Sequence, residues 1–144
     1  MTEYIHKVQY YETDRMGITH HSNYIRWMEE ARTDFLDQIG WGYDKLEEMG
    51  IISPVVSVNA EYKHTTTFHD TVVIRTGVKE FKGVRLIVRY EMRDQKTGNL
   101  VFTGISTHCF QNKNGKLIRL NREYPEFDHA LKEQAAEQEG SFNQ

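Results

Sequence analysis

The sequence has a single cysteine, Cys109, so no disulfide can form within the chain. Cys109 lies in an apolar run that alternates like a strand, which favours a buried structural thiol over a nucleophile. No stretch approaches the roughly 18 apolar residues of a membrane-spanning helix. The first residues, MTEYIHKVQYYETD, carry no signal-peptide apolar region. We therefore expect a cytoplasmic protein with no membrane span.

The sequence also has no excess of positive charge. It contains 18 lysines and arginines and 21 aspartates and glutamates, which gives a net charge of −3. Holding a nucleic-acid backbone takes many phosphate contacts, so we expect no nucleic-acid partner. A small anionic ligand needs only a local basic patch and is compatible with this balance. The 144 residues suit one domain. We predict a single domain over residues 1–144, with a frayed tail over about 137–144.

Apolar residues at helical spacing predict one long helix after residue 22. They form one stripe, made of Tyr24, Trp27, Met28, Ala31, Phe35 and Ile39. Ser22 or Asn23 can cap the start of this helix, and Gly40 fits its C-terminal end. Shorter helical stretches are predicted from Asp44 to Met49 and after Pro125, which suits a first helical turn.

Alternating apolar and polar residues predict strands before and after the long helix. The first covers residues 4–11, with Tyr10 on the same face as Tyr4. The later strands cover residues 56–63, 71–81, 84–93 and 100–111. One long helix against one curled antiparallel sheet is an α+β plan, in which the sheet buries the helix stripe. Because a single sheet leaves a face or an edge exposed, we expect a homo-oligomer.

The segment from Tyr10 to Tyr24 concentrates the groups that could carry chemistry. It reads YYETDRMGITHHSNY and holds two carboxylates, two histidines and three tyrosines just before the long helix. Unpaired backbone N–H groups at a helix start can accept a developing negative charge. Asp14, in the preceding loop, could act as a base or a nucleophile. Together these groups suit acyl transfer to water.

This segment resembles the signature of the 4-hydroxybenzoyl-CoA thioesterase family, and it is most similar to the acyl-CoA thioesterase branch associated with the Tol–Pal system. The pattern Y-x-x-T-D-x-x-G-x-x-x-H-x-x-Y is formed by Tyr10, Thr13, Asp14, Gly17, His21 and Tyr24. The helix that follows also fits the family, at Trp27, Glu30, Ala31 and Arg32. His20 departs from the branch, which usually has tyrosine there. This departure bears on the shape of the acyl pocket rather than on the chemistry.

The resemblance implies a hotdog fold, in which a curled antiparallel sheet of five or so strands wraps the long helix. Active sites would lie at the interface of a homodimer or homotetramer. It implies that Asp14 is the essential carboxylate and that the His21 backbone N–H lies against the thioester carbonyl. Some members also assign roles to the Tyr10 hydroxyl and the His21 side chain. Gly17 and Tyr24 would shape the substrate site.

Coenzyme A would be part of the substrate, with no metal and no other cofactor required. Lys82 lies in the turn where some relatives place basic phosphate contacts, and Arg85 lies just beyond it. We therefore include both among the substrate-binding residues. Their plainer interpretation is ordinary solvated charge.

The catalytic candidates have plainer interpretations as well. Asp14 could be a turn carboxylate, His21 a first-turn histidine bonded to a nearby carbonyl, and Tyr10 a strand tyrosine packed on the helix. A metal site made by Asp14, His20 and His21 is disfavoured, because zinc usually takes ligands from more than one short segment.

We predict an acyl-CoA thioesterase with Asp14 as general base or nucleophile. Two alternatives stay open. One is a thioesterase for acyl groups on acyl carrier protein, and the other is a non-catalytic acyl-CoA-binding hotdog protein. The sequence does not predict the length or aromaticity of the acyl group.

Overall fold

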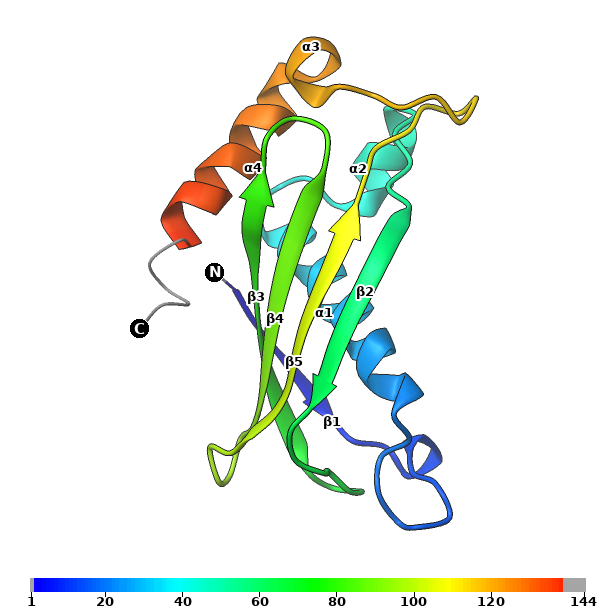
Figure 1. The fold of residues 1–144 in the computed structure, drawn as a ribbon, viewed down its shortest axis with the longest axis vertical. Helices are drawn as coiled ribbons and strands as arrows, with labels where there is room; N and C mark the ends of the chain where they lie inside the picture. The colour runs from blue at the N-terminus through cyan, green and yellow to red at the C-terminus, as the bar shows by residue number, and fades with distance from the viewer. Residues whose placement is uncertain (1, 139–144) are drawn as a thin grey trace.

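The computed structural model describes residues 2–138 of the chain. Antiparallel strands form one sheet in the order β1-β3-β4-β5-β2, and the long helix α1 lies across one face of it (Figure 1). The strands are β1 (Thr2–Lys7), β2 (Val55–Tyr62), β3 (Thr71–Phe81), β4 (Leu86–Asp94) and β5 (Leu100–His108). The predicted α+β class is confirmed.

Helix α1 (Ser22–Gln38) buries the predicted apolar stripe against the sheet. Its central side chains are at most 1% exposed, namely Trp27, Met28, Ala31 and Phe35. Helix and sheet approach each other tightly at Gly104 in β5. A Cβ added there would lie 2.7 Å from the Phe102 ring and 3.1 Å from Met28 Cε. A residue without a side chain therefore sets how close α1 can come.

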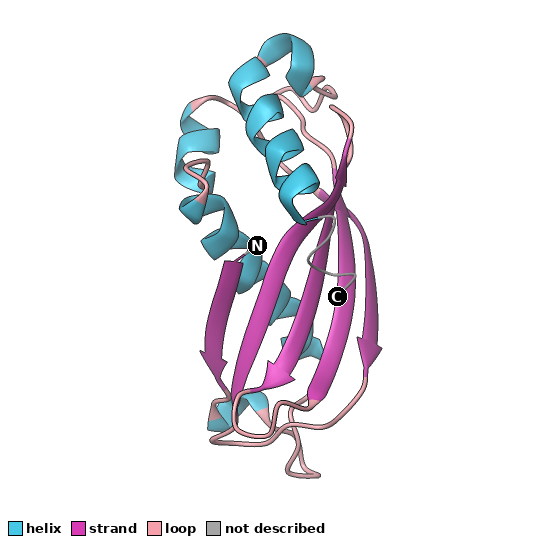
Figure 2. Cartoon of the chain, turned by 90° about the vertical axis from the view of Figure 1, so that its left-hand side faces the viewer, coloured by secondary structure: helices cyan, strands magenta, loops and turns pink. Residues whose placement is uncertain are grey.

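Three shorter α-helices lie in the described part of the chain, α2 (Tyr43–Glu48), α3 (Leu120–Glu123) and α4 (Pro125–Gln138). Because β1 pairs with only the first half of β3, α4 packs against that strand near its other end (Figure 2). Phe127 anchors α4, with its ring centroid 4.8 Å from that of Trp41 and 5.5 Å from that of Phe110. The predicted tail falls almost entirely on residues 139–144, outside the described residues.

The structure corrects the prediction of a strand over residues 4–11. The ladder with β3 ends at the pair Lys7–Thr71, and only Val8 continues the backbone bonding, by donating to the Asp70 oxygen at 2.8 Å. Tyr10 lies instead in the 3-10 turn η1 (Tyr10–Glu12) and is 75% exposed. It is therefore not a strand tyrosine packed on the helix.

The predicted cap of the long helix is also wrong. The N-cap of α1 is His21, and Ser22 is already helical. Asn23 lies within the helix, and its side chain donates from Nδ2 to the backbone oxygen of Glu12 at 2.9 Å. Two strands are slightly shorter than predicted, since β4 begins at Leu86 and β5 ends at His108.

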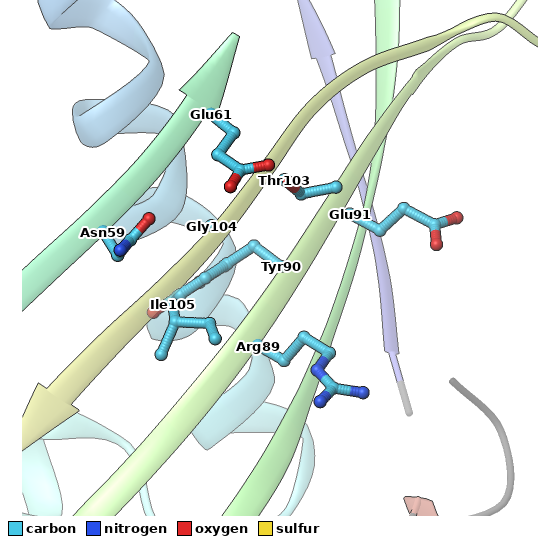
Figure 3. Close-up of a pocket in the computed structure, with 8 residues that line it drawn as sticks. All are labelled: Asn59, Glu61, Arg89, Tyr90, Glu91, Thr103, Gly104 and Ile105. Carbon is cyan, nitrogen blue, oxygen red and sulfur yellow. The ribbon is translucent and has the colours of Figure 1, made fainter. Parts of the chain in front are cut away.

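The face of the sheet opposite α1 carries charged and polar side chains. A hollow of about 240 Å³ on this face is lined by Asn59, Glu61, Arg89, Tyr90, Glu91, Thr103, Gly104 and Ile105, which Figure 3 draws as sticks. Glu91 pairs there with Arg93 Nε at 2.8 Å. None of the residues predicted to act in catalysis or substrate binding lines this hollow. Within residues 2–138, no helix combines the length and apolar character needed to cross a membrane.

Candidate active site

A closed loop between η1 and α1 carries Asp14. Its two arms are joined by an isolated bridge between Thr13 and Thr19 and by a hydrogen bond from the Asp14 N–H to the Ile18 oxygen at 2.8 Å. Gly17 closes the tip with φ +81°, a conformation that side chains resist. The glycine of the sequence pattern is therefore a requirement of the turn.

Asp14 is half-buried, and its loop lies at the end of the sheet at which α1 begins (Figure 1). One oxygen of the Asp14 carboxylate, Oδ1, accepts a hydrogen bond from the Met16 N–H at 2.8 Å, an Asx-type turn. This bond fixes the side chain while leaving other lone pairs of the carboxylate for a reactant.

The start of α1 supplies a backbone donor. Within the described residues, the His21 N–H donates no hydrogen bond, and it lies at the positive end of a 17-residue helix. The neighbouring Ser22 N–H is occupied, since it donates to His20 Nδ1 at 3.2 Å. The imidazoles of His20 and His21 stack at 4.4 Å between ring centroids, and both are exposed. His21 therefore offers a backbone N–H and an imidazole at one point.

A second loop, residues 63–70, holds the first one in place. The Thr19 N–H donates to the Thr66 oxygen at 2.9 Å, and the two threonine hydroxyls lie 2.6 Å apart. Thr67 Oγ1 donates to the Gly17 oxygen at 2.6 Å. The sequence pattern does not reveal Thr66 and Thr67, because they lie about fifty positions away and meet the loop only in the fold.

A pocket of about 240 Å³ lies where the two loops meet the helix start. It is lined by Ile18, Thr19, His21, Tyr24, Tyr62, Lys63, His64 and Thr65. The Tyr62 hydroxyl donates to the His21 oxygen at 3.1 Å, so β2 is tied to the first turn of α1. Asp14 is one backbone hydrogen bond away from this pocket, through Ile18.

Aromatic rings form one side of this pocket. Tyr24 is 3% exposed, and its ring stacks on Phe102 at 5.3 Å and meets Tyr62 edge to face at 5.3 Å. The Tyr24 hydroxyl shares a hydrogen bond of 2.9 Å with Thr66 Oγ1. Burial raises the pKa of Tyr24, so the hydroxyl stays neutral. Tyr24 thus forms a fixed wall of the pocket. Its hydroxyl is already bonded to Thr66 and does not serve as an acid in the reaction.

Tyr10 lies at the same end of the sheet and faces outward. Its backbone oxygen accepts from Thr13 N at 3.1 Å and from Thr13 Oγ1 at 2.7 Å. Its ring meets Phe68 edge to face at 5.6 Å. Phe68 lies in a strained turn, because the next residue, His69, has φ +78° although it is not glycine. The sequence gives no sign of this aromatic pair.

Lys82 and Arg85 are not brought to Asp14 within one chain. They follow β3, whose 11 residues span about 36 Å at roughly 3.3 Å per residue. Figure 1 shows the β3–β4 turn and the loop before α1 at opposite ends of the sheet. The Lys82 side chain is 84% exposed and pairs with Glu80 at 3.1 Å.

Residues 2–138 contain no group of three or more His, Cys, Asp and Glu side chains placed to hold a metal ion. The groups placed at this end of the sheet are the Asp14 carboxylate, the stacked imidazoles of His20 and His21 and the unpaired His21 N–H, beside an apolar wall. Such a set can activate water or attack a carbonyl while stabilising the oxyanion that forms.

Comparisons with known proteins identify the family. The family model of the thioesterase-like superfamily matches residues 8–135. The putative acyl-CoA thioesterase YneP of Bacillus subtilis is 33% identical over 125 residues, which cover 86% of this chain and 90% of that protein.

Two solved structures are similar in both sequence and fold. The DHNA-CoA thioesterase from Staphylococcus aureus is 35% identical, with a TM-score of 0.89 over 96% of this chain and 94% of that one. The gentisyl-coenzyme A thioesterase BH1999 is 28% identical, with a TM-score of 0.75 over 81% of this chain and 94% of that one. The chain therefore belongs to the thioesterase-like superfamily, has the hotdog fold, and is a thioester hydrolase.

Proposed function

We propose that this protein hydrolyses acyl-CoA thioesters to a carboxylic acid and free coenzyme A, with Asp14 as the catalytic carboxylate. The observation that carries the proposal is the pairing of two groups at one loop. Asp14 has a half-buried carboxylate fixed through a single oxygen, and the His21 N–H at the helix start has no partner in the described chain. His21 lines the aromatic pocket, and the Asp14 N–H donates to the oxygen of Ile18, which lines it as well.

Either of two routes is open to Asp14. As a base, it takes a proton from water while the water oxygen attacks the thioester carbon. As a nucleophile, its oxygen attacks directly and forms a mixed anhydride that water then cleaves. In both routes, charge develops on the thioester oxygen, where the His21 N–H can stabilise it. The C–S bond then breaks, and coenzyme A leaves as a thiolate.

We propose an aromatic acyl group as the first substrate class to test. The Staphylococcus aureus relative is named for DHNA-CoA and the BH1999 protein for gentisyl-coenzyme A. The wall formed by Tyr24 and Tyr62 suits a planar acyl group, because offset and edge-to-face ring contacts are favourable. Membership of the Tol–Pal branch and a cytoplasmic location stay predictions.

We also propose that the active enzyme is a homodimer or a dimer of dimers. Strand β2 ends the sheet, with no strand beyond it. If two β2 edges pair antiparallel, the second copy runs in the opposite direction. Its β3–β4 turn, with Lys82 and Arg85, would then lie at the same end as Asp14 of the first copy. The two basic residues could meet the phosphates of coenzyme A there.

Thiol release tests the proposal. We would measure turnover of 4-hydroxybenzoyl-, 1,4-dihydroxy-2-naphthoyl-, short-chain and long-chain acyl-CoA with a chromogenic thiol reagent. Asp14→Asn should fold normally and lose at least about 10²-fold in kcat, because an amide is neither base nor nucleophile. The matched control is Asp44→Asn, an exposed aspartate in α2, which should keep wild-type turnover.

The outcomes separate the candidate functions. Near-wild-type turnover by Asp14→Asn would overturn the role of Asp14. If the wild type hydrolyses none of the coenzyme A thioesters, acyl groups on acyl carrier protein become the next substrates to test. Tight binding of an intact thioester without hydrolysis would indicate a binding protein instead.

A further inference from the structure

Glu12 is a buried carboxylate two residues before Asp14. It is only 5% exposed, and its carboxylate accepts three hydrogen bonds. Oε1 accepts from the Gln9 N–H and from His6 Nε2, both at 2.8 Å, and Oε2 accepts from Trp27 Nε1 at 2.7 Å. The donors come from the end of β1, from η1 and from α1. One side chain therefore joins three elements beneath the loop.

This carboxylate is held in its charged form. Burial by itself raises the pKa of Glu12, but the hydrogen bonds from Gln9, His6 and Trp27 outweigh it, so the pKa lies below its usual range. An ionised carboxylate away from water is tolerated only where its lone pairs are satisfied. The surrounding donors are therefore built for a carboxylate at this position.

His6 couples the same site to the surface. Its Nδ1 lies 3.2 Å from Glu30 Oε2 on the side opposite Glu12, and its ring lies 4.6 Å from the ring of Trp27. Each ring nitrogen of His6 thus faces a carboxylate oxygen.

The backbone of Glu12 holds the other arm of the loop. Its carbonyl oxygen accepts from the His20 N–H at 2.8 Å and from Asn23 Nδ2 at 2.9 Å. The His20 peptide precedes the one that carries the His21 N–H. Fixing it therefore restricts the direction in which that N–H can point.

We propose that Glu12 is the positioning residue of the active site, since its carboxylate anchors the arm that leads to Asp14 and its carbonyl anchors the arm that leads to the His21 N–H. This inference rests on the proposed function of Asp14 and His21. Glu12 touches no reactant. It sets the distance and angle between the two groups that do.

Glu12→Gln is the first test. The amide keeps the shape, but its NH₂ group cannot accept, so at least one of the three donors loses its acceptor. A displaced reacting group costs roughly 10- to 100-fold in rate, and we expect kcat to fall by that factor with little change in KM. Glu30→Gln is the matched control, because it contacts the same His6 from a side chain that is 42% exposed, and it should keep wild-type kcat.

Asn23→Ala tests the second arm without touching the carboxylate. We expect it to lower kcat in the same range, again with little change in KM. It also keeps the proposal testable if Glu12→Gln does not fold.

Hydrogen exchange gives a readout that does not depend on activity. We expect faster amide exchange over residues 13–21 in Glu12→Gln and in Asn23→Ala, with exchange in β4 unchanged. A folded Glu12→Gln with wild-type kcat and wild-type exchange over residues 13–21 would overturn the proposal. Changes of the same size in kcat and in amide exchange in Glu30→Gln would also overturn it. If the wild type has no thioesterase activity, the proposed function fails by itself, and the exchange result still decides whether Glu12 holds the loop.

Discussion

His108 ends a line of buried hydrogen bonds between α1 and the sheet. Arg32 donates to the hydroxyls of Tyr43 and Tyr90, both at 3.0 Å. Tyr90 and His108 Nε2 each share a bond of 2.7 Å with Ser106 Oγ. His108 is fully buried, and its Nδ1 has no partner among the described residues. Protonating this ring would place a second charge near Arg32 in the core.

The protein should therefore lose stability in mild acid. Burial, and then the charge of Arg32, lower the pKa of His108 from 6.5 to about 4. The unfolded chain takes up this proton below pH 6.5, while the folded one resists until about pH 4. The stabilisation is thus complete above pH 6.5 and is lost as the pH falls toward 4, to a total of about 3 kcal/mol. Urea unfolding between pH 7.5 and 4 measures it.

His108→Gln should flatten this pH dependence, because the amide does not titrate. His64→Gln, at an exposed site, is the control and should keep the wild-type slope. The same slope in His108→Gln and in wild type would show that other groups cause the acid loss. Glu12 acts at lower pH, because its depressed pKa means that its contribution is lost only below the usual range for a glutamate.

Glu12 and Asp14 show what can be predicted from the sequence at this scale. Both are acidic residues in one short segment, and the family pattern singles out Asp14. The pattern says nothing of Glu12, because its donors lie at Gln9, His6 and Trp27, and only folding brings them together. The buried charge depends on Trp27, 15 positions along the chain, and on the turn that brings Gln9 and His6 back to Glu12, and the family pattern describes none of these contacts.

The periodic elements are the part of the fold that the sequence predicts best. The apolar stripe places α1, and the strand predicted over residues 71–81 has the bounds of β3, Thr71–Phe81. The strand predicted over residues 4–11 is wrong at its end, although the alternation continues through Tyr10. Backbone bonding ends at Val8, just past the start of β3, and the chain then turns into η1. A strand ends where its partner ends, and that partner is set by the topology.

The contact between α1 and the sheet depends on Gly104. Replacing it with alanine would place a methyl group 2.7 Å from Phe102 Cε1 and 3.1 Å from Met28 Cε. Overpacking of this kind typically costs 1–3 kcal/mol, so we expect Gly104→Ala to lower the free energy of unfolding by about 2 kcal/mol. Thr103→Ala, on the opposite face of the same strand, should change it by less than about 0.5 kcal/mol. Equal stabilities by urea unfolding would contradict tight packing at this point.

At the scale of the whole molecule, the outer edge of β2 has no partner strand among residues 2–138. β2 is an edge strand of the sheet. Four of its apolar side chains are 42–51% exposed, namely Val55, Val56, Val58 and Tyr62. Ile52 and Leu117 are exposed as well. An unpaired apolar edge of this kind invites pairing with another strand, and an isologous pair of β2 strands would cover both copies at once.

The chain should therefore run in solution as a dimer or a larger even assembly, and Val58→Asp should return it to the 17.0 kDa of one chain. A carboxylate at a paired edge would be buried without a partner, which costs more than the contact gains. If the second copy supplies Lys82 and Arg85, the monomeric Val58→Asp variant should also lose thioester turnover at low substrate concentration. The loss should be at least about tenfold, as expected for a lost charged contact. Light scattering measures the mass, and a parallel thiol-release assay measures the turnover.

Ile5→Asp is the matched control, because Ile5 is 58% exposed on β1, the other edge strand. This variant should keep both the mass and the turnover of the wild type. A wild type that is monomeric and active would show that one chain holds the complete site, and Lys82 and Arg85 would then have no part in binding coenzyme A.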